Sequence, residues 1–159
     1  MSDTRAEILP VDSPLTTAAR ITINAPARTI FDLLASPADH KRFDGSGTVR
    51  GSLSGPDRLF LGAQFGMSMK INLPYRIKNT VITFEENKKI TWCHLMKWRW
   101  SYELNSISAT QTVVTESFDA RDIPAFATWW LERTGAMAHN PKWMAKSLVA
   151  LKSIAEGKV

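Results

Sequence analysis

The chain has 159 residues, of which 44% are hydrophobic and 22% are charged, and its formal net charge is +5. These values are ordinary for one globular domain that buries a core and has room for an internal cavity. The single cysteine, Cys93, excludes an internal disulfide and a cysteine-rich metal site, and no apolar run reaches the ~18 residues of a membrane span.

The basic residues are scattered along the chain, without zinc-finger spacing, a basic-aromatic RNA motif or an arginine-rich tract. We therefore expect no nucleic-acid partner in spite of the positive charge. The first residues lack the apolar core of a signal peptide, which predicts a cytoplasmic protein. No pair of histidines has ligand spacing on one element, so we expect no metal, and nothing else in the sequence points to a cofactor.

In chain order, residues 1–15 are expected to form a flexible leader and residues 16–159 a single domain. After a first strand, one short helix is predicted to start with Asn24 near the N-cap position and Pro26 in its first turn. A second short helix is predicted to follow, with Ser36 as its N-cap and Pro37 at its first helical position, where the missing N–H costs little.

Seven strands are predicted from runs of β-forming residues separated by turn-forming residues. They cover residues 16–23, 48–54, 63–71, 75–86, 89–95, 98–106 and 110–119. After Pro124 the hydrophobic period becomes that of a helix, with an apolar segment over residues 125–138. Asn140 and Pro141 are predicted to start the last helix, which Gly157 ends.

One face of this last helix is apolar, and its lysines, including Lys152, are expected mostly on the opposite, solvated side. The apolar face carries Met144, Ser147, Leu148, Leu151, Ile154 and Ala155, at spacings of three and four residues. An antiparallel sheet that curls around this helix would bury the apolar faces of both. The expected fold class is α+β: a curved antiparallel sheet of about seven strands around a long C-terminal helix, with two short helices after the first strand.

A hairpin rich in aromatic residues follows from the pairing of the fifth and sixth predicted strands. If residues 95–97 form a three-residue turn, opposed residues point to the same face of the sheet. The opposed pairs are then His94 and Trp98, Trp92 and Trp100, and Ile90 and Tyr102. A two-residue turn would put Trp92 and Trp100 on opposite faces, with bulky indoles in water, so burial favours the three-residue turn.

The candidates for catalysis are His94, Tyr102 and Glu116. His94 can donate and accept a proton near its ordinary pKa of ~6.5, although a lone histidine near a strand end is more often a structural or exposed residue. Glu103 and Glu116 are interpreted as outer-face partners of Arg99. If Glu116 turns inward instead, it becomes a candidate base.

If the sheet and the last helix enclose a cavity, one set of residues is expected to line it and bind a ligand. This set is Phe65, Met67, Met69, Trp92, His94, Trp98, Trp100, Tyr102, Met144, Ser147, Leu148 and Leu151. Tryptophan and tyrosine suit a pocket wall because they join an apolar surface to a hydrogen-bonding tip, but the hairpin residues can equally pack in a filled core, and core packing is the default expectation for Met67 and Met69. Residues 44–47 (DGSG) lack the pattern of a phosphate loop and are expected to form a flexible rim.

Several segments in this order resemble the START-like (SRPBCC) superfamily, which includes polyketide cyclases/dehydrases and lipid-transport domains. The segments are INAPARTIFDLLASPADHKRFDGSGTVRG, TVITFEENKKITW, RWSYELN followed by TVVTESFD, and the closing NPKWMAKSLVALKSIAEG. They look like an uncharacterised actinobacterial-type branch. The resemblance implies a helix-grip fold with a deep, mainly apolar cavity, but a shared fold does not establish a shared activity. It carries over no catalytic residue, because no one catalytic set is common to the superfamily.

The expected function is the binding of an apolar small molecule, lipid-like or polycyclic and polyketide-like, between the sheet and the C-terminal helix. The first alternative is a polyketide cyclase or dehydratase that uses the same cavity, with His94 or Tyr102 moving protons. The second alternative is an interaction module with a filled core and no cavity. The sequence leaves the ligand, the existence of a reaction and the oligomeric state open.

Overall fold

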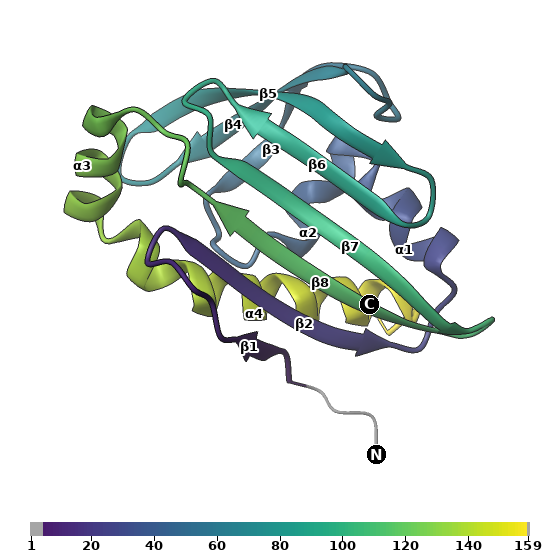
Figure 1. Ribbon diagram of the computed structural model, residues 1–159. Coiled ribbons are helices and arrows are strands. Elements are labelled where there is room, and N and C mark those ends of the chain that lie inside the picture. The colour runs from purple at the N-terminus through teal and green to yellow at the C-terminus, as the bar shows by residue number, and fades with distance from the viewer. Residues whose placement is uncertain (1–4, 159) are drawn as a thin grey trace.

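The computed structural model describes residues 5–158 (Figure 1). The strands are β1 (Glu7–Leu9), β2 (Thr16–Ile23), β3 (Val49–Ser54), β4 (Gln64–Lys70), β5 (Pro74–Glu85), β6 (Lys89–His94), β7 (Arg99–Ser108) and β8 (Gln111–Asp119). The helices are α1 (Ala27–Leu34), the 3-10 turn η1 (Pro37–Asp39), α2 (His40–Phe43), α3 (Ala125–Thr134) and α4 (Ala136–Ala155). None of the helices in this part of the chain combines the length and hydropathy needed to cross a membrane.

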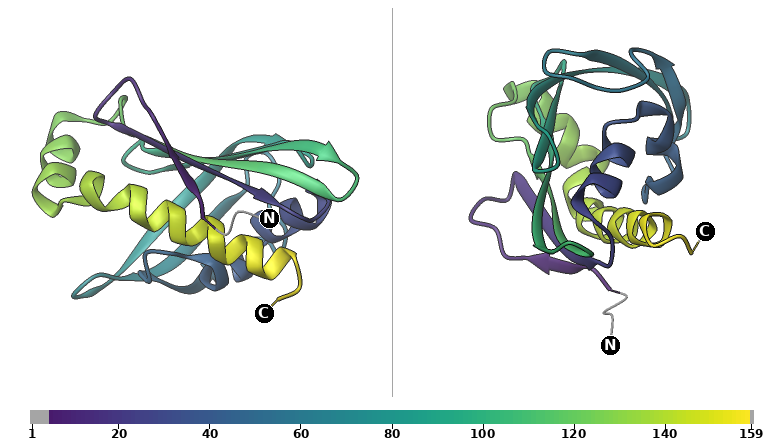
Figure 2. Two further views of the ribbon diagram at one scale, coloured as in Figure 1. Left: turned by 90° about the horizontal axis from the view of Figure 1, so that it is seen from below. Right: turned by 90° about the vertical axis from the view of Figure 1, so that its right-hand side faces the viewer.

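All eight strands form one antiparallel sheet in the order β1-β2-β8-β7-β6-β5-β4-β3. The sheet twists and curls, as strands of L-residues do. Helix α4 lies along its concave side, and α1 and α2 lie beside α4 near the opening of the curl (Figure 2). The predicted fold class is therefore confirmed: an α+β helix-grip fold with a curved antiparallel sheet around the C-terminal helix.

The eighth strand, β1, lies in the segment that was predicted to be a flexible leader. It pairs with β2 from Glu7 opposite Arg20 to Leu9 opposite Ala18, and the Glu7 and Arg20 side chains form an ion pair at 2.7 Å. The leader prediction is wrong for these residues, because the outer edge of β2 offers unpaired backbone groups that a short extended segment can satisfy. Residues 1–4 of the predicted leader lie outside the described residues.

Two predicted helix starts are also wrong. Helix α1 has Pro26, not Asn24, at its N-cap position, and the Asn24 Oδ1 atom accepts a hydrogen bond from Gln111 Nε2 at 2.9 Å. Helix α4 begins directly after Gly135, whose φ of 68° ends α3 and starts α4, so Pro141 lies inside the helix. The sequence pattern of Asn140 and Pro141 is typical of a helix start, but the left-handed glycine before it makes the turn instead.

The apolar face of α4 packs on the sheet, and Leu148 and Leu151 are completely buried there. Lys152, which was expected on the solvated side, is only 4% exposed. Its Nζ atom donates to the Thr22 carbonyl at 2.6 Å and forms an ion pair with Glu156 at 2.7 Å. The prediction fails because a lysine near the end of a helix can reach a backbone carbonyl near the end of the strand it packs on, while Glu156 compensates its charge.

Candidate functional site

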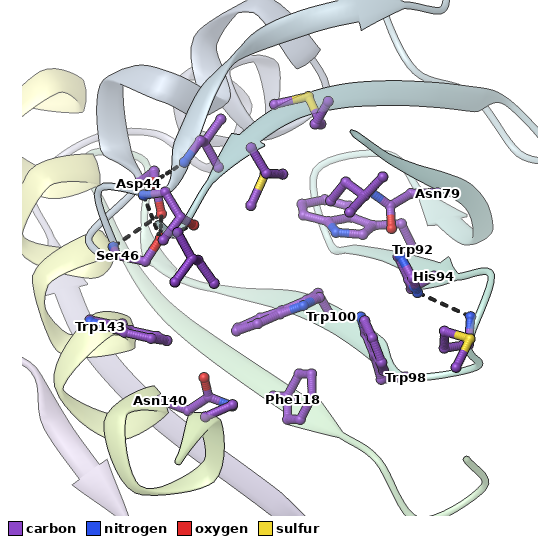
Figure 3. A pocket seen from close by; sticks show the side chains of 18 of the residues that line it. Asp44, Ser46, Asn79, Trp92, His94, Trp98, Trp100, Phe118, Asn140 and Trp143 are labelled. Atoms are coloured by element: carbon purple, nitrogen blue, oxygen red, sulfur yellow. Dashed lines mark hydrogen bonds between the residues drawn. The ribbon is translucent and has the colours of Figure 1, made fainter. Parts of the chain in front are cut away.

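A cavity of about 610 Å³ lies between the concave face of the sheet and helices α3 and α4. Its walls come from strands β3 to β8, from α2 and from the two last helices, so residues far apart in the sequence meet around it (Figure 3). All six tryptophans of the chain contribute to the walls: Trp92, Trp98, Trp100, Trp129, Trp130 and Trp143. The walls are thus mainly aromatic and aliphatic, with a few polar groups among them.

The β6–β7 hairpin has the predicted register, with Trp92 opposite Trp100 and Ile90 opposite Tyr102. The Lys97 N–H donates to the His94 carbonyl at 2.8 Å, and Lys97 has a φ of 72°, so residues 95–97 form the three-residue turn. This register turns one face of the hairpin toward the cavity. The side chains that reach its wall from this face are Trp92, His94, Trp98, Trp100 and Tyr102, whereas Ile90 packs in the core.

The other residues of the expected binding set divide into two groups. Phe65, Met67 and Met69 of β4 and Met144 and Ser147 of α4 lie on the cavity wall. Leu148 and Leu151 do not line the cavity but belong to the hydrophobic core. At this end α4 packs against β2, and the Lys152 ammonium group reaches the Thr22 carbonyl.

His94 lies on the cavity side of the sheet, half-buried near the β6–β7 turn. Its Nδ1 atom accepts a hydrogen bond from the Met96 N–H at 3.0 Å, which places the ring proton on Nε2 at neutral charge. The ring stacks on Trp98, with centroids 4.1 Å apart. Burial lowers the pKa of His94, so the ring is neutral around pH 7 and offers one N–H donor.

Glu116 points inward, contrary to the preferred sequence interpretation. It is 3% exposed, it pairs across the sheet with Tyr102, and both residues belong to the cavity wall. The outer-face partners are different: Arg99 forms an ion pair with Asp122 at 2.7 Å, and Glu103 lies 3.8 Å from Lys89. The alternation of buried residues along β8, with Glu116 in phase with Val114 and Phe118, was the signal that could have shown this.

The environment of Glu116 keeps its carboxyl group neutral around pH 7. Burial raises the pKa of Glu116 to about 8, and the negative charge of Asp44 adds to the rise. A hydrogen bond from Tyr102 favours the ionised form and opposes part of this rise. Burial and the neighbouring Glu116 also raise the pKa of Tyr102 well above its ordinary value. The wall therefore holds a neutral carboxylic acid beside a neutral phenol.

His40 is a second polar residue that the sequence interpretation missed, because it lies in a short helix of polar character. It is buried, and its Nε2–H donates to the Leu34 carbonyl at 2.8 Å. The ring stacks on Trp92 with centroids 5.0 Å apart and lines the cavity. Burial lowers the pKa of His40, so this residue too is neutral around pH 7.

The segment expected to be a flexible rim, residues 44–47, is held in place by hydrogen bonds. The Asp44 carboxylate accepts from the backbone N–H groups of Ser46 at 3.0 Å and Val49 at 2.9 Å. The Gly45 N–H donates to Ser147 Oγ at 2.8 Å, so the hydroxyl oxygen of this α4 residue binds the backbone of the loop. A side chain at Gly45 would lie 2.3 Å from the Trp143 carbonyl oxygen, which explains why glycine stands at this close contact.

The cavity reaches the surface between α3 and the turn that joins β4 to β5. Phe126 and Trp129 of α3 are 65% and 61% exposed, and Ile71 and Tyr75 beside the turn are also exposed, yet all four line the cavity. Both segments lie at the same end of the molecule (Figure 1). Exposed apolar side chains that gather around an opening are unusual on a protein surface.

Among residues 5–158, no cluster of three or more histidine, cysteine, aspartate or glutamate side chains is arranged to hold a metal ion. The polar groups of the cavity wall are instead suited to single hydrogen bonds. They can fix the orientation of an otherwise apolar guest.

The chain matches no known protein-family profile. It is 40% identical over 134 residues to the uncharacterized protein Rv0088 of Mycobacterium tuberculosis, a match that covers 82% of this chain and 60% of the relative's length. The chain thus spans somewhat less than two thirds of that relative, for which no function is stated.

Solved structures with low sequence identity share the fold. The Polyketide_cyc-like protein Cgl2372 of Corynebacterium glutamicum superimposes with a TM-score of 0.65 at 19% identity, over 93% of this chain and 95% of that one. Protein Ms6760 of Mycobacterium smegmatis superimposes with a TM-score of 0.68 at 12% identity, over 98% and 99% of the two chains. The protein therefore has the polyketide-cyclase-like, START-like fold that its sequence resembles, with uncharacterised actinobacterial relatives.

Proposed function

We propose that this protein binds one apolar small molecule, lipid-like or polycyclic, in the cavity between the sheet and helices α3 and α4. The observation that carries the proposal is a space of about 610 Å³ whose walls include all six tryptophans. This volume lies within the range of natural ligand pockets, and a filled core would leave no such space. Transfer of the guest's apolar surface from water would supply the affinity, at about 25 cal/mol per Å².

The first test uses the tryptophans as probes. Because every tryptophan lies on the wall, saturable quenching of the intrinsic fluorescence by fatty acids or polycyclic aromatics is expected, together with a rise in melting temperature. Native mass spectrometry of the purified protein would show a molecule that binds during expression. A panel of such compounds that neither quenches nor stabilises would contradict the proposal.

A pair of matched variants separates binding in the cavity from binding to the surface. Met67→Trp adds a large ring to the cavity wall, whereas Ile82→Trp adds the same ring to an exposed position of β5 outside the cavity. The first variant should weaken binding by equilibrium dialysis and reduce the ligand-induced rise in melting temperature, and the second should leave both unchanged. Equal behaviour of the two variants would count against the cavity as the site.

A second candidate function is that of a cyclase or dehydratase, and the neutral Glu116 beside Tyr102 is the observation that favours it. A carboxylic acid that is neutral at working pH can protonate a leaving hydroxyl group, and cavity walls can hold a flexible chain in a folded conformation. Mass spectrometry of bound polyketide-like compounds distinguishes the two functions. A binder returns them unchanged. A dehydratase returns them with one water molecule fewer, and a cyclase that does not dehydrate returns an isomer of the same mass, which a preceding chromatographic separation resolves.

A further inference from the structure

We propose that the natural ligand carries a neutral hydrogen-bond acceptor, such as a ketone, ester or amide carbonyl, which receives a hydrogen bond from the carboxyl group of Glu116. This inference rests on the proposed function, because it places one polar group of an otherwise apolar guest. It names the chemical class of that group and the side chain that recognises it.

The geometry around Glu116 leaves one of its oxygens without a partner. The side chain belongs to the cavity wall and is almost fully buried. Tyr102, directly opposite on β7, is within hydrogen-bonding reach of the carboxyl group. The Oε2 atom is buried and has no hydrogen-bond partner among the residues that the structure describes. A buried polar atom without a partner costs about as much as a lost hydrogen bond, so a ligand that satisfies it gains selectivity.

The surroundings of the carboxyl group determine which partner it needs. Asp44, in the loop after α2, is the charged group that acts on it, and its negative charge disfavours ionisation of Glu116. His40 of α2 is buried and neutral, and β2 places Ala19 opposite Glu116. Helix α4 contributes to the same cavity the uncharged residues Asn140, Met144 and Ser147. Glu116 therefore stays protonated around pH 7.

A protonated carboxyl group has one donor and one acceptor. The Tyr102 hydroxyl donates to the carboxyl, which leaves the proton on the free oxygen, Oε2, available to a guest. A carbonyl oxygen satisfies this donor. A ligand carboxylate would bring a second negative charge close to Asp44 in an apolar site, and its desolvation would cost more than one hydrogen bond returns. A group that only donates would meet another donor.

Three compounds with one flat skeleton test this inference: fluorene, 9-fluorenone and carbazole, which carry at the same bridging position a CH₂ group, a carbonyl acceptor and an N–H donor. Their dissociation constants are measured by equilibrium dialysis at pH 6.5 and pH 9.5 with the wild type, Glu116→Gln and Glu116→Leu. For each protein, the dissociation constant of fluorene is divided by that of fluorenone. This ratio is then compared between proteins, because the difference in hydration between the two compounds is the same for every protein and cancels. Circular dichroism confirms that each protein is folded at each pH.

At pH 6.5 the ratio should favour fluorenone about 10-fold more in the wild type than in Glu116→Leu, as expected for one hydrogen bond worth about 1.4 kcal/mol. At pH 9.5 the wild-type preference should disappear, because the ionised carboxylate cannot donate. Glu116→Gln retains an N–H donor without a titratable proton, so it should keep the preference at both pH values.

The failures of the two proposals are distinguishable. If fluorene binds but the ratio is the same in the wild type and both variants, the acceptor proposal is wrong and a water molecule or nothing satisfies Oε2. If at pH 6.5 the wild type prefers carbazole, and not fluorenone, over fluorene more strongly than Glu116→Leu does, the ligand group is a donor, and the proposal is again wrong. If none of the three compounds binds, the apolar-guest function fails, and this inference fails with it. Should Glu116→Leu not fold, the pH dependence of the wild type against Glu116→Gln still decides.

Discussion

At the scale of single residues, the protein buries ionisable groups in uncharged form around one cavity. Glu116, His40 and Tyr102 are all buried, and burial is the largest influence on the pKa of each. Around pH 7 the buried Glu116 reduces the free energy of unfolding, because the unfolded chain ionises this carboxyl group more easily, whereas a tyrosine is neutral in both states at this pH. Proteins retain groups of this kind where function needs a neutral donor or acceptor inside an apolar site.

The pH dependence of stability should show the cost of Glu116. Its pKa is about 8 in the folded protein and about 4.5 in the unfolded chain. The contribution of the protonated Glu116 to the free energy of unfolding is therefore fully present below about pH 4.5. It is lost as the pH rises toward 8, and the free energy of unfolding falls by at most about 1.4 kcal/mol per pH unit. Urea unfolding from pH 4 to pH 8.5 should show Glu116→Gln gaining stability over the wild type as the pH rises.

The matched control is Glu103→Gln, on the exposed face of the neighbouring strand. The free energy of unfolding of this variant should follow the wild-type pH curve, because the carboxyl group that the substitution removes is exposed to water. If Glu116→Gln also runs parallel to the wild type over the whole range, the carboxyl group is ionised in the folded protein and the neutral-donor argument fails.

At the scale of elements, α4 has two functions along its length. Its C-terminal half packs on the sheet through Leu148 and Leu151, and its N-terminal half, with Asn140 and Met144, forms a wall of the cavity. Gly135, in the left-handed conformation, joins it directly to α3, so the helix that frames the mouth and the helix that forms the wall are connected by one residue.

Alanine substitutions at two positions of α4 should distinguish these two functions. Leu148→Ala removes a completely buried side chain away from the cavity and should lower the free energy of unfolding by about 2–5 kcal/mol. Met144→Ala enlarges a space that already exists and should cost less, while it changes the affinity for large guests. Urea unfolding of the ligand-free proteins measures both, and a larger cost for Met144→Ala would indicate that the cavity is filled in solution.

At the scale of the whole molecule, α3 and the turns of the β4–β5 and β6–β7 hairpins lie at the same end of the sheet (Figure 1). Residues from all three segments line the cavity between the sheet and α4. A row of stacked rings crosses this region, from His94 to Trp98 at 4.1 Å and from Trp98 to Trp130 of α3 at 6.2 Å. The row connects α3 to the β6–β7 hairpin by side-chain contacts that must separate if a bulky guest passes between them.

Removing one ring of this row should speed the exchange of ligand. Trp130→Ala is expected to raise both the association and the dissociation rate several-fold in stopped-flow fluorescence, with a smaller change in affinity, because the mouth opens more often. Ile107→Ala, an exposed apolar position in β7 that does not line the cavity, is the control and should leave both rates unchanged. Identical rates in the two variants would mean that ligands pass elsewhere.

Local patterns were enough to predict the curved sheet, the terminal helix and the register of the aromatic hairpin. A register error of one residue would have exposed Trp92 or Trp100, so burial alone selected the correct pairing. The same reasoning missed β1, because three residues carry too little periodicity to be told from a loop. It also missed the start of α4, because the conformation of Gly135 depends on where α3 and α4 must pack.

The sequence by itself determined which side chains share a face of each strand and which face of α4 is apolar, since both follow from the fixed periods of strand and helix. The period of β8 already put Glu116 on the same face as Val114 and Phe118. Only the tertiary structure decided that Glu116 and Tyr102 meet at the wall of a cavity, that His40 is buried against Trp92, and that a space remains between sheet and helix at one end but not at Leu148 and Leu151. These features depend on the curvature of the sheet and on the distance of α4 from it along its length, and no local pattern encodes either.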